Sequence, residues 1–277
     1  MSIPDTAARA EQLHRLHLGE RPLVLVNAWD AGSARVLEAA GCPVIATSSA
    51  AMAWSLGYQD GESLPAEDLF DTCVRILRVI RVPLTVDFER GFASSADAVA
   101  GHAQRLIELG AVGINIEDGQ EAGALVALDH ACERIAAARR AAQRCGVRLF
   151  INARTDAYFL AAEPPGGRFE TALARARQFI EAGADGIFVP GMDRIEDVGR
   201  FARAIDRPFN VYAGYPGVPP VDALATAGAR RVSLGCGPLQ SAFGLLGRVA
   251  DEALHRGRTE AMCAGMMSAS QLNKLFA

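Results

Sequence analysis

The chain has 277 residues, half of them apolar, and its formal net charge is −4. This length allows one large hydrophobic core or two ordinary ones. No block of basic residues accompanies the negative charge, which excludes the phosphate-neutralising surface typical of nucleic-acid-binding proteins. No apolar run is long enough to cross a bilayer and the first residues do not resemble a signal peptide, so we expect no membrane partner.

The cysteines and the lysine narrow the chemistry further. Six cysteines occur without a C-x-x-C pair, which favours reduced thiols in a cytoplasmic protein over a disulfide framework or a zinc site. Lys274 is the only lysine in the sequence. Because a Schiff-base mechanism needs a buried, strand-borne lysine, Lys274 is a poor candidate for one.

Short β-branched runs alternate with helical stretches rich in Ala, Leu and Arg along the whole chain. The predicted strands cover residues 23–27, 43–48, 83–87, 112–117, 148–154, 185–190, 208–212 and 230–234. The predicted helices cover residues 31–40, 66–80, 94–109, 129–144, 169–182, 194–204, 220–227 and 238–254. This alternation indicates a parallel sheet, and eight units without a linker predict a single α/β domain over residues 1–277, a (β/α)8 TIM-type barrel.

Both ends of the chain extend beyond the predicted barrel. Residues 1–20 have the pattern of an additional helix, which we expect across the bottom of the barrel. Residues 238–277 form a long helical extension after the eighth strand, with more apolar stretches than one closing helix needs. We therefore expect a homo-oligomer sealed through these C-terminal helices.

Polar side chains gather at the carboxyl ends of the predicted strands, where barrel enzymes carry their sites. Residues two apart in a strand share a face, so Asp87 and Glu89 point inward together after the third strand. The same rule pairs Asn115 with Glu117 on the fourth strand, and Asn152 with Arg154 on the fifth. We take Asn115 as a substrate-binding candidate, and Arg154 and Glu117 as catalytic candidates.

Clustered inward carboxylates repel one another in a poorly solvated place unless a proton, an arginine or a cation offsets their charge. Since no histidine stands at a strand end, this ligand set suits Mg²⁺, or Mn²⁺, better than zinc. The alternative is that Asp87 and Glu89 act as helix caps or as rim partners of arginines. The five histidines fall on predicted helices or their edges, where surface or capping roles are expected. His130 alone borders the loop after the fourth strand and is kept as a candidate acid.

Several segments, in order and at suitable spacing, resemble the isocitrate lyase/phosphoenolpyruvate mutase superfamily. They are VNAWDAGSARVLEAAG, TSSAAMAWSLGYQDGE, VDFERGF, VGINIEDG, INARTDA, GADGIFVPG and RRVSLG. The resemblance implies a (β/α)8 barrel that binds Mg²⁺ and small 2-oxo or 2-hydroxy carboxylic acids. It also implies dimers or tetramers whose subunits exchange the last helix.

The resemblance assigns roles position by position. Asp87 matches the acid closest to the metal, and the acids that hold the metal's waters match Asp60, Glu89 and Glu117. The segment that cradles the substrate carboxylate matches Ser48, Ser49 and Ala50. Arg154 matches the arginine that pairs with the substrate's anionic group, and Trp29 and Asn210 match pocket-lining positions.

The loop after the fourth strand departs from that family. The lyases carry a Cys-Gly-His run there and the mutases a lysine with an Asn-Ser pair, but this chain has EDGQEAGALVALDHA. Gly119 and Gly123 flank small residues, so we expect the loop to act as a lid that excludes water. The glutamate that isocitrate-type lyases place after the sixth strand is also missing, since FVPGMD stands there.

The pattern favours a Mg²⁺-dependent carbon–carbon lyase that decarboxylates or cleaves a small 2-oxo or 2-hydroxy acid through a metal-stabilised enolate. Carbon–phosphorus chemistry of the phosphonomutase or phosphonopyruvate hydrolase kind is one alternative. A non-catalytic barrel that binds 2-oxo acids is another. A sugar-phosphate barrel using LGCGPLQS as its phosphate site has only that glycine pair in its favour.

Overall fold

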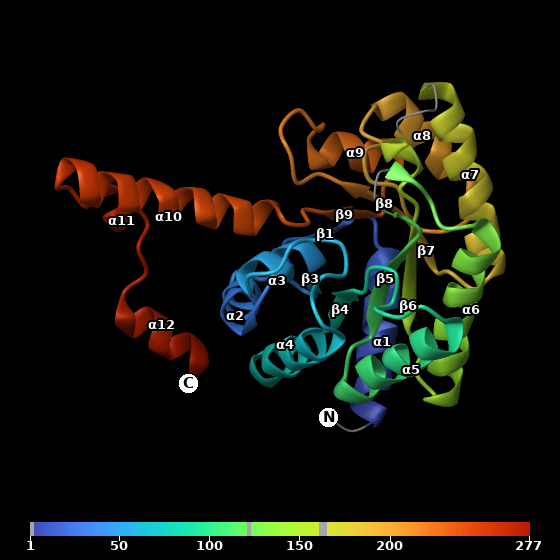
Figure 1. The fold of residues 1–277 in the computed structure, drawn as a ribbon, viewed down its shortest axis with the longest axis horizontal. Helices are drawn as coiled ribbons and strands as arrows, with labels where there is room; N and C mark the ends of the chain where they lie inside the picture. The colour runs from blue at the N-terminus through green and yellow to red at the C-terminus, as the bar shows by residue number, and fades with distance from the viewer. Residues whose placement is uncertain (1–2, 121–122, 161–164) are drawn as a thin grey trace.

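The computed structural model describes residues 3–120, 123–160 and 165–277. Its centre is a sheet of parallel strands in the order β1-β9-β8-β7-β6-β5-β4-β3-β2 (Figure 1). The strands are β1 (Leu23–Leu25), β2 (Asn27–Ala28), β3 (Ile45–Thr47), β4 (Leu84–Asp87), β5 (Gly113–Glu117), β6 (Phe150–Arg154), β7 (Gly186–Phe188), β8 (Phe209–Tyr212) and β9 (Arg231–Ser233).

The sheet curls into a barrel because its two outermost strands are parts of one chain segment. β1 pairs with β9 through Leu23 and Arg231, while β2 pairs with β3 through Asn27 and Ala46. Only Val26 separates β1 from β2, so the predicted first strand spans the seam. The (β/α)8 prediction is confirmed.

Helices surround the barrel between successive strands. They are α2 (Ala31–Ala39), α3 (Ser49–Ser55), α4 (Ala66–Val79), α5 (Ala96–Leu109), α6 (Leu128–Arg144), α7 (Pro165–Glu181), α8 (Ile195–Ala204) and α9 (Val221–Ala227), with a short 3₁₀ turn at Ala157–Phe159. Helix α5 shows the local rules at work. Ser95 caps its first turn, and Gly110 ends it at a φ of 117°, which only glycine adopts readily.

The additional helix α1 (Ile3–His17) covers the bottom of the barrel, as predicted. Leu13 and His17 are fully buried, and the His17 ring stacks on Phe150, the first residue of β6, with centroids 3.8 Å apart. The expectation that all five histidines lie at the surface or cap helices is wrong for His14 and His17. Both rings are buried against this end of the barrel, and burial lowers the pKa of His17 to about 3.

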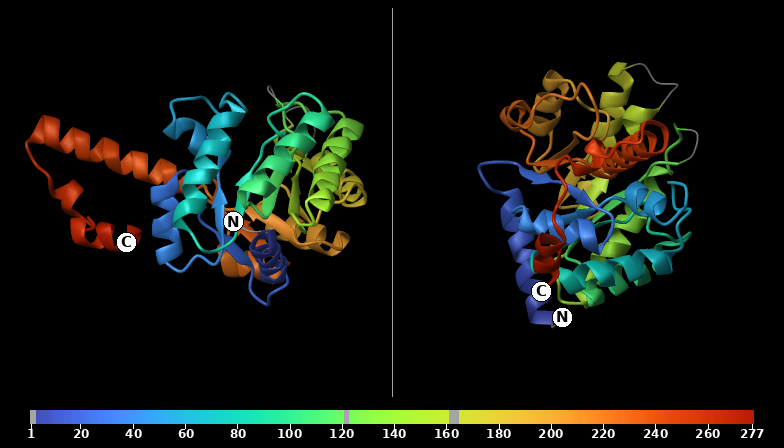
Figure 2. Two further views of the ribbon diagram at one scale, coloured as in Figure 1. Left: turned by 90° about the horizontal axis from the view of Figure 1, so that it is seen from below. Right: turned by 90° about the vertical axis from the view of Figure 1, so that its left-hand side faces the viewer.

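The C-terminal helices leave the barrel as an arm. Helix α10 (Gly237–Arg256) projects away from the barrel, and α11 (Glu260–Cys263) and α12 (Ala269–Phe276) fold back beneath it (Figures 1 and 2). The arm returns toward α2, where the Arg35 guanidinium donates a hydrogen bond to the Leu275 carbonyl. None of the described helices is both long and apolar enough to span a bilayer.

Candidate active site

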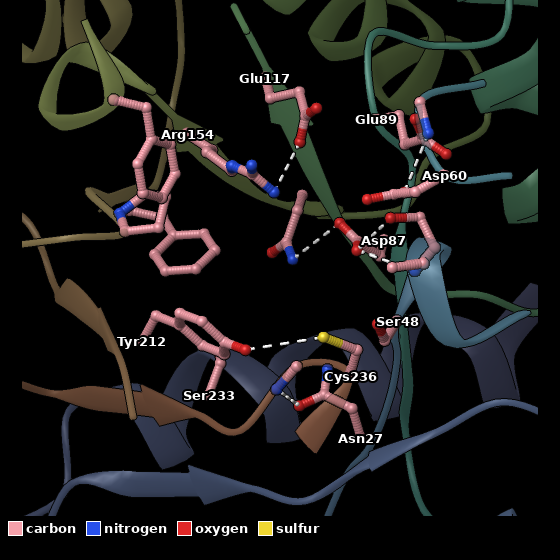
Figure 3. A pocket seen from close by; sticks show the side chains of 18 residues that line it. Asn27, Ser48, Asp60, Asp87, Glu89, Glu117, Arg154, Tyr212, Ser233 and Cys236 are labelled. Atoms are coloured by element: carbon pink, nitrogen blue, oxygen red, sulfur yellow. Dashed lines mark hydrogen bonds and ion pairs between the residues drawn. The ribbon is translucent and has the colours of Figure 1, made fainter. Parts of the chain in front are cut away.

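A cavity of about 230 Å³ opens at the carboxyl ends of the strands. This is smaller than the roughly 300–1,000 Å³ of pockets for drug-sized ligands, so it suits a small acid. Figure 3 shows its acidic side, with Asp60, Asp87 and Glu89, facing Arg154. The described residues that line it are Asn27, Ser48, Ser49, Ala50, Asp60, Gly61, Asp87, Glu89, Asn115, Glu117, Arg154, Phe159, Phe188, Pro190, Tyr212, Ser233, Gly235 and Cys236.

Asp87 is the last residue of β4, and both oxygens of its carboxylate accept hydrogen bonds. Oδ2 accepts from the Ser49 amide at 2.9 Å and from the Ser49 hydroxyl at 2.8 Å. Oδ1 accepts from Nδ2 of Asn115, its neighbour on β5, at 3.3 Å. The side chain is only 9% exposed and is therefore fixed against the wall of the cavity.

Glu89 and Asp60 extend the acidic side beyond the end of β4. Glu89 is 3% exposed and has a φ of 44°, a left-handed conformation unusual for a residue with a side chain. Burial, together with the charges of Asp87 and Asp60, raises the pKa of Glu89 to about 8. Burial and Asp87 also raise the pKa of Asp60. These carboxyl groups are thus crowded into a place that disfavours their charge.

Arg154, the last residue of β6, supplies positive charge on the other side. Its Nε and Nη2 donate to the two oxygens of Asp156 at 2.6 Å and 2.9 Å. Its Nη1 lies 2.9 Å from Oε2 of Glu117, although the angles there are not those of a hydrogen bond. Burial lowers the pKa of Arg154, but Glu117 and Asp156 outweigh it and raise the pKa well above its usual value. The guanidinium therefore stays charged.

A buried ion pair supports Arg154 from behind. Asp118 is fully buried and pairs with Arg175 of α7 at 3.0 Å. Its other oxygen accepts from the Asp156 amide at 2.9 Å, which fixes the segment that bears the partner of Arg154. Both carboxylates therefore hold arginines, and the Asp156 side chain makes no capping bond to the 3₁₀ turn that follows it.

The residues on the acidic side fit a divalent cation. Among the described residues four carboxylates line the cavity, and Asp60, Asp87 and Glu89 have no cationic partner in their ion pairs. Within residues 3–120, 123–160 and 165–277, no three Asp, Glu, His or Cys side chains converge as direct ligands of one ion. Mg²⁺ commonly keeps several waters and binds one or two carboxylates, so the arrangement suits an ion held at Asp87 and, through water, at its neighbours.

The Ser48–Ala50 segment lines the cavity, but its donors are used differently from the expectation. The Ser48 hydroxyl caps α3 by accepting from the Ala51 amide at 3.4 Å. Both donors of Ser49 are bonded to Asp87. A buried carboxylate without other charged partners attracts the nearest donors, so in this structure Ser49 secures Asp87 instead of presenting its donors to a substrate.

Three predicted site residues lie outside the cavity lining. Trp29 is half-buried and packs against the core before α2, and Asn210 is fully buried and donates to the Ser233 hydroxyl at 3.1 Å. His130 is exposed on the first turn of α6. The Val126 amide donates a hydrogen bond to the Asp118 carbonyl. This bond turns the chain back toward the outer ring of helices before it reaches His130.

The loop after β5 is held near its base. Gly119 forms a bridge with Leu125, and Val126 is buried in the core. Neither Leu125 nor Val126 lines the cavity. The predicted lid includes residues 121–122, which lie outside the described residues.

The sequence interpretation missed cavity residues on the far side from the acids. Tyr212 ends β8 and its hydroxyl lies 3.6 Å from Sγ of Cys236, the residue before α10 (Figure 3). Tyr212 shares its strand face with Asn210, so the two-residue rule that identified Glu117 also identifies Tyr212. No sequence pattern identified Cys236, because it lies in a loop, where the two-residue periodicity of a strand does not apply.

The chain is similar to several known proteins. The model of the phosphoenolpyruvate phosphomutase family matches residues 13–254. A solved structure from Burkholderia cenocepacia J2315, provisionally assigned as a phosphonomutase, is 37% identical, with 90% of this chain and 99% of that chain covered and a TM-score of 0.85. A second from the same organism, provisionally assigned as a lyase/mutase, is 31% identical, with 99% and 97% covered and a TM-score of 0.91.

A relative of assigned activity is the 2-methylisocitrate lyase of Escherichia coli (strain K12). It is 30% identical over 267 residues, which cover 93% of this chain and 87% of that protein. The family match over residues 13–254 spans the strands that carry Asp87, Glu117 and Arg154. The chain therefore belongs to the phosphoenolpyruvate phosphomutase family, within the PEP mutase/isocitrate lyase superfamily of lyases and mutases.

Proposed function

We propose that the protein is a Mg²⁺-dependent carbon–carbon lyase that acts on a small 2-oxo or 2-hydroxy carboxylic acid. The observation that carries this proposal is the division of the cavity into an acidic side at Asp87 and a cationic side at Arg154. A small dicarboxylic acid has two groups to match these sides. One is a carboxylate with an adjacent oxygen, and the other is a second anionic group.

The two sides would perform different tasks. A divalent cation at Asp87, with Asp60, Glu89 and Glu117 holding its waters, would supply Lewis-acid stabilisation of charge that develops on the substrate. Arg154 would bind the second anionic group. Because Asp156 accepts from its Nε and Nη2, the guanidinium is already oriented, with Nη1 beside Glu117, which also lines the cavity.

Glu117 and the apolar wall complete this assignment. Burial raises the pKa of Glu117 well above its usual value, against the opposing influence of Arg154. Its Oε2 is thus placed to hold or release a proton beside the group that Arg154 binds. Phe159, Phe188 and Pro190 line the cavity and would shield part of a bound substrate from water.

Turnover assays test the proposal directly. Purified protein is incubated with a panel of short 2-oxo and 2-hydroxy acids, with Mg²⁺ or with EDTA, and products are followed by NMR. We expect at least one acid to be cleaved or decarboxylated with Mg²⁺ only. Tight binding of an acid without turnover of any would instead identify a non-catalytic binding barrel.

Carbon–phosphorus chemistry is the second candidate, favoured by the 37% identity to the provisionally assigned phosphonomutase. The loop after β5 lacks the lysine and the Asn-Ser pair that the resemblance associates with the mutases. Phosphonopyruvate therefore belongs in the same panel. Release of phosphate, or rearrangement to a phosphate ester detected by ³¹P NMR, would replace the carbon–carbon assignment.

A further inference from the structure

Arg231 is a buried charge directly beneath the candidate active site. It begins β9, is 1% exposed, and lies outside the cavity lining. Burying a guanidinium is strongly unfavourable unless the protein satisfies it. Burial lowers the pKa of Arg231 to about 9, against the opposing pull of Asp87, so the group remains protonated at neutral pH.

The contacts of Arg231 lead to two residues that do line the cavity. Nη2 donates to Oδ1 of Asn115 at 3.0 Å, and Nε donates to the Ser233 hydroxyl at 3.3 Å. Nη1 is buried and has no hydrogen-bond partner in the part of the chain that the structure describes. Both of these acceptors are neutral, so neither contact is an ion pair that would offset the cost of burying the guanidinium. This argues that the charge of Arg231 serves something other than stability.

These contacts determine which way the Asn115 amide faces. An arginine can only donate, so the oxygen of Asn115 must face Arg231. Asn152 donates to the same oxygen at 2.9 Å. The amide nitrogen is thereby directed at Oδ1 of Asp87, 3.3 Å away. In the opposite orientation two oxygens would face each other across that gap.

We propose that Arg231 is a positioning residue of the metal site, which acts through Asn115 to hold the Asp87 carboxylate in its metal-binding orientation. The inference rests on the proposed function, because it assumes that Asp87 binds the cation. Ser49 holds one oxygen of Asp87 and Asn115 the other, so the carboxylate is fixed from both ends.

The two possible roles of Arg231 predict opposite changes in cation affinity when Arg231 is removed, and this makes the inference testable. If Arg231 acted only as a nearby positive charge, its loss would strengthen cation binding by removing repulsion. If Arg231 acts through Asn115, its loss frees the amide to turn and weakens cation binding. Residues that hydrogen-bond to a metal ligand typically contribute 10–100-fold to metal affinity. Asn115 is such a residue for Asp87, and Arg231 lies one hydrogen bond beyond Asn115.

The test is the affinity for Mn²⁺ alone, measured by electron paramagnetic resonance on full-length protein. We expect Arg231→Met to weaken Mn²⁺ binding about tenfold or more. Arg231→Lys, which restores a charged donor toward Asn115, should recover much of the loss. The matched control is Arg139→Met. Arg139 donates to the Gly183 and Leu149 carbonyls at the opposite end of the barrel, so its loss should lower stability without changing Mn²⁺ affinity.

Asn115→Ala distinguishes an effect of Arg231 that passes through Asn115 from an effect of its charge alone. It also covers the case in which Arg231→Met does not fold. It should weaken Mn²⁺ binding as Arg231→Met does, and Arg231→Lys should have no effect in that background. Unchanged or tighter Mn²⁺ binding in Arg231→Met, or in Asn115→Ala, would overturn the inference while the metal site stands. A parent protein that binds no Mn²⁺ would overturn both.

Discussion

Individual residues of the acidic side give the protein an unusual pH response. The pKa of Glu89 is raised by burial, and then by Asp87 and Asp60, from 4.5 to about 8. Between those values the folded state binds a proton that the unfolded state has lost. Stability of the metal-free protein therefore falls as pH rises through this window, by up to about 1.4 kcal/mol per pH unit.

A bound cation should remove this penalty, because it neutralises the carboxylates in place of the proton. We expect the rise in Tm produced by saturating Mg²⁺ to be larger at pH 8 than at pH 5, by roughly several degrees. Scanning calorimetry measures the Tm with and without Mg²⁺ at each pH. In Glu89→Gln the difference between the two pH values should shrink. A Mg²⁺ effect that is equal at both values in the parent would contradict this reading of the cluster.

The support of Arg154 depends on a glycine. A Cβ at Gly119 would lie 2.1 Å from Oδ2 of Asp156. Gly119→Ala should therefore displace the Asp156 carboxylate and release Arg154. Losing a charge-assisted hydrogen bond costs roughly 1.5–3 kcal/mol, so we expect KM to rise about tenfold or more. The control is Gly101→Ala, where a Cβ meets nothing within 4 Å. Equal KM values in both variants would show that Asp156 does not orient Arg154.

At the residue scale, the sequence predicted those side chains that strand periodicity alone determines. Asp87, Asn115, Glu117 and Arg154 stand at strand ends with a common inward face, and all of them line the cavity. The hydrogen-bond partners of these side chains were not predictable. That Ser49 bonds to Asp87, or that Arg231 reaches Asn115, depends on distances between elements that no spacing within one strand reveals.

At the scale of elements, alternation of short apolar runs with helical patterns located every barrel strand. The helix α3 was missed because its seven residues, SAAMAWS, are too few and too small to show a helical period. The loop after β5 was also misjudged in part. Its Val126 reads as an apolar lid residue in sequence, but the bond from its amide to the Asp118 carbonyl draws it into the core.

At the scale of the whole molecule, the count of eight units predicted the barrel, since eight parallel strands close with side chains filling the interior. The course of the C-terminal arm was not predictable, because its elements contact little of the barrel. Large apolar side chains on the arm remain exposed. They include Phe243, Leu246, Leu254, Met266 and Phe276.

We propose that a second copy of the chain covers these side chains, as in a homodimer or homotetramer. An apolar surface of this kind is unfavourable in a monomer. Leu246 and Leu254 are 63% and 78% exposed, so Leu246→Arg with Leu254→Arg should weaken assembly without touching the core. Sedimentation should show an oligomer for the parent and smaller species for the double variant. A parent that sediments as a monomer at micromolar concentration would contradict the proposal.

We propose that turnover depends on a divalent cation bound at Asp87, and Asp87→Ala tests this dependence most directly. The matched control is Asp30→Ala, which removes an exposed acid that caps α2 outside the cavity. Mn²⁺ affinity and Mg²⁺-dependent turnover are measured for both variants and the parent, with folding checked by circular dichroism. We predict that Asp87→Ala folds but loses more than about 100-fold in both, beyond the 10–100-fold of an outer contact, while Asp30→Ala retains both. Parent-like Mn²⁺ binding and turnover in folded Asp87→Ala would contradict the account.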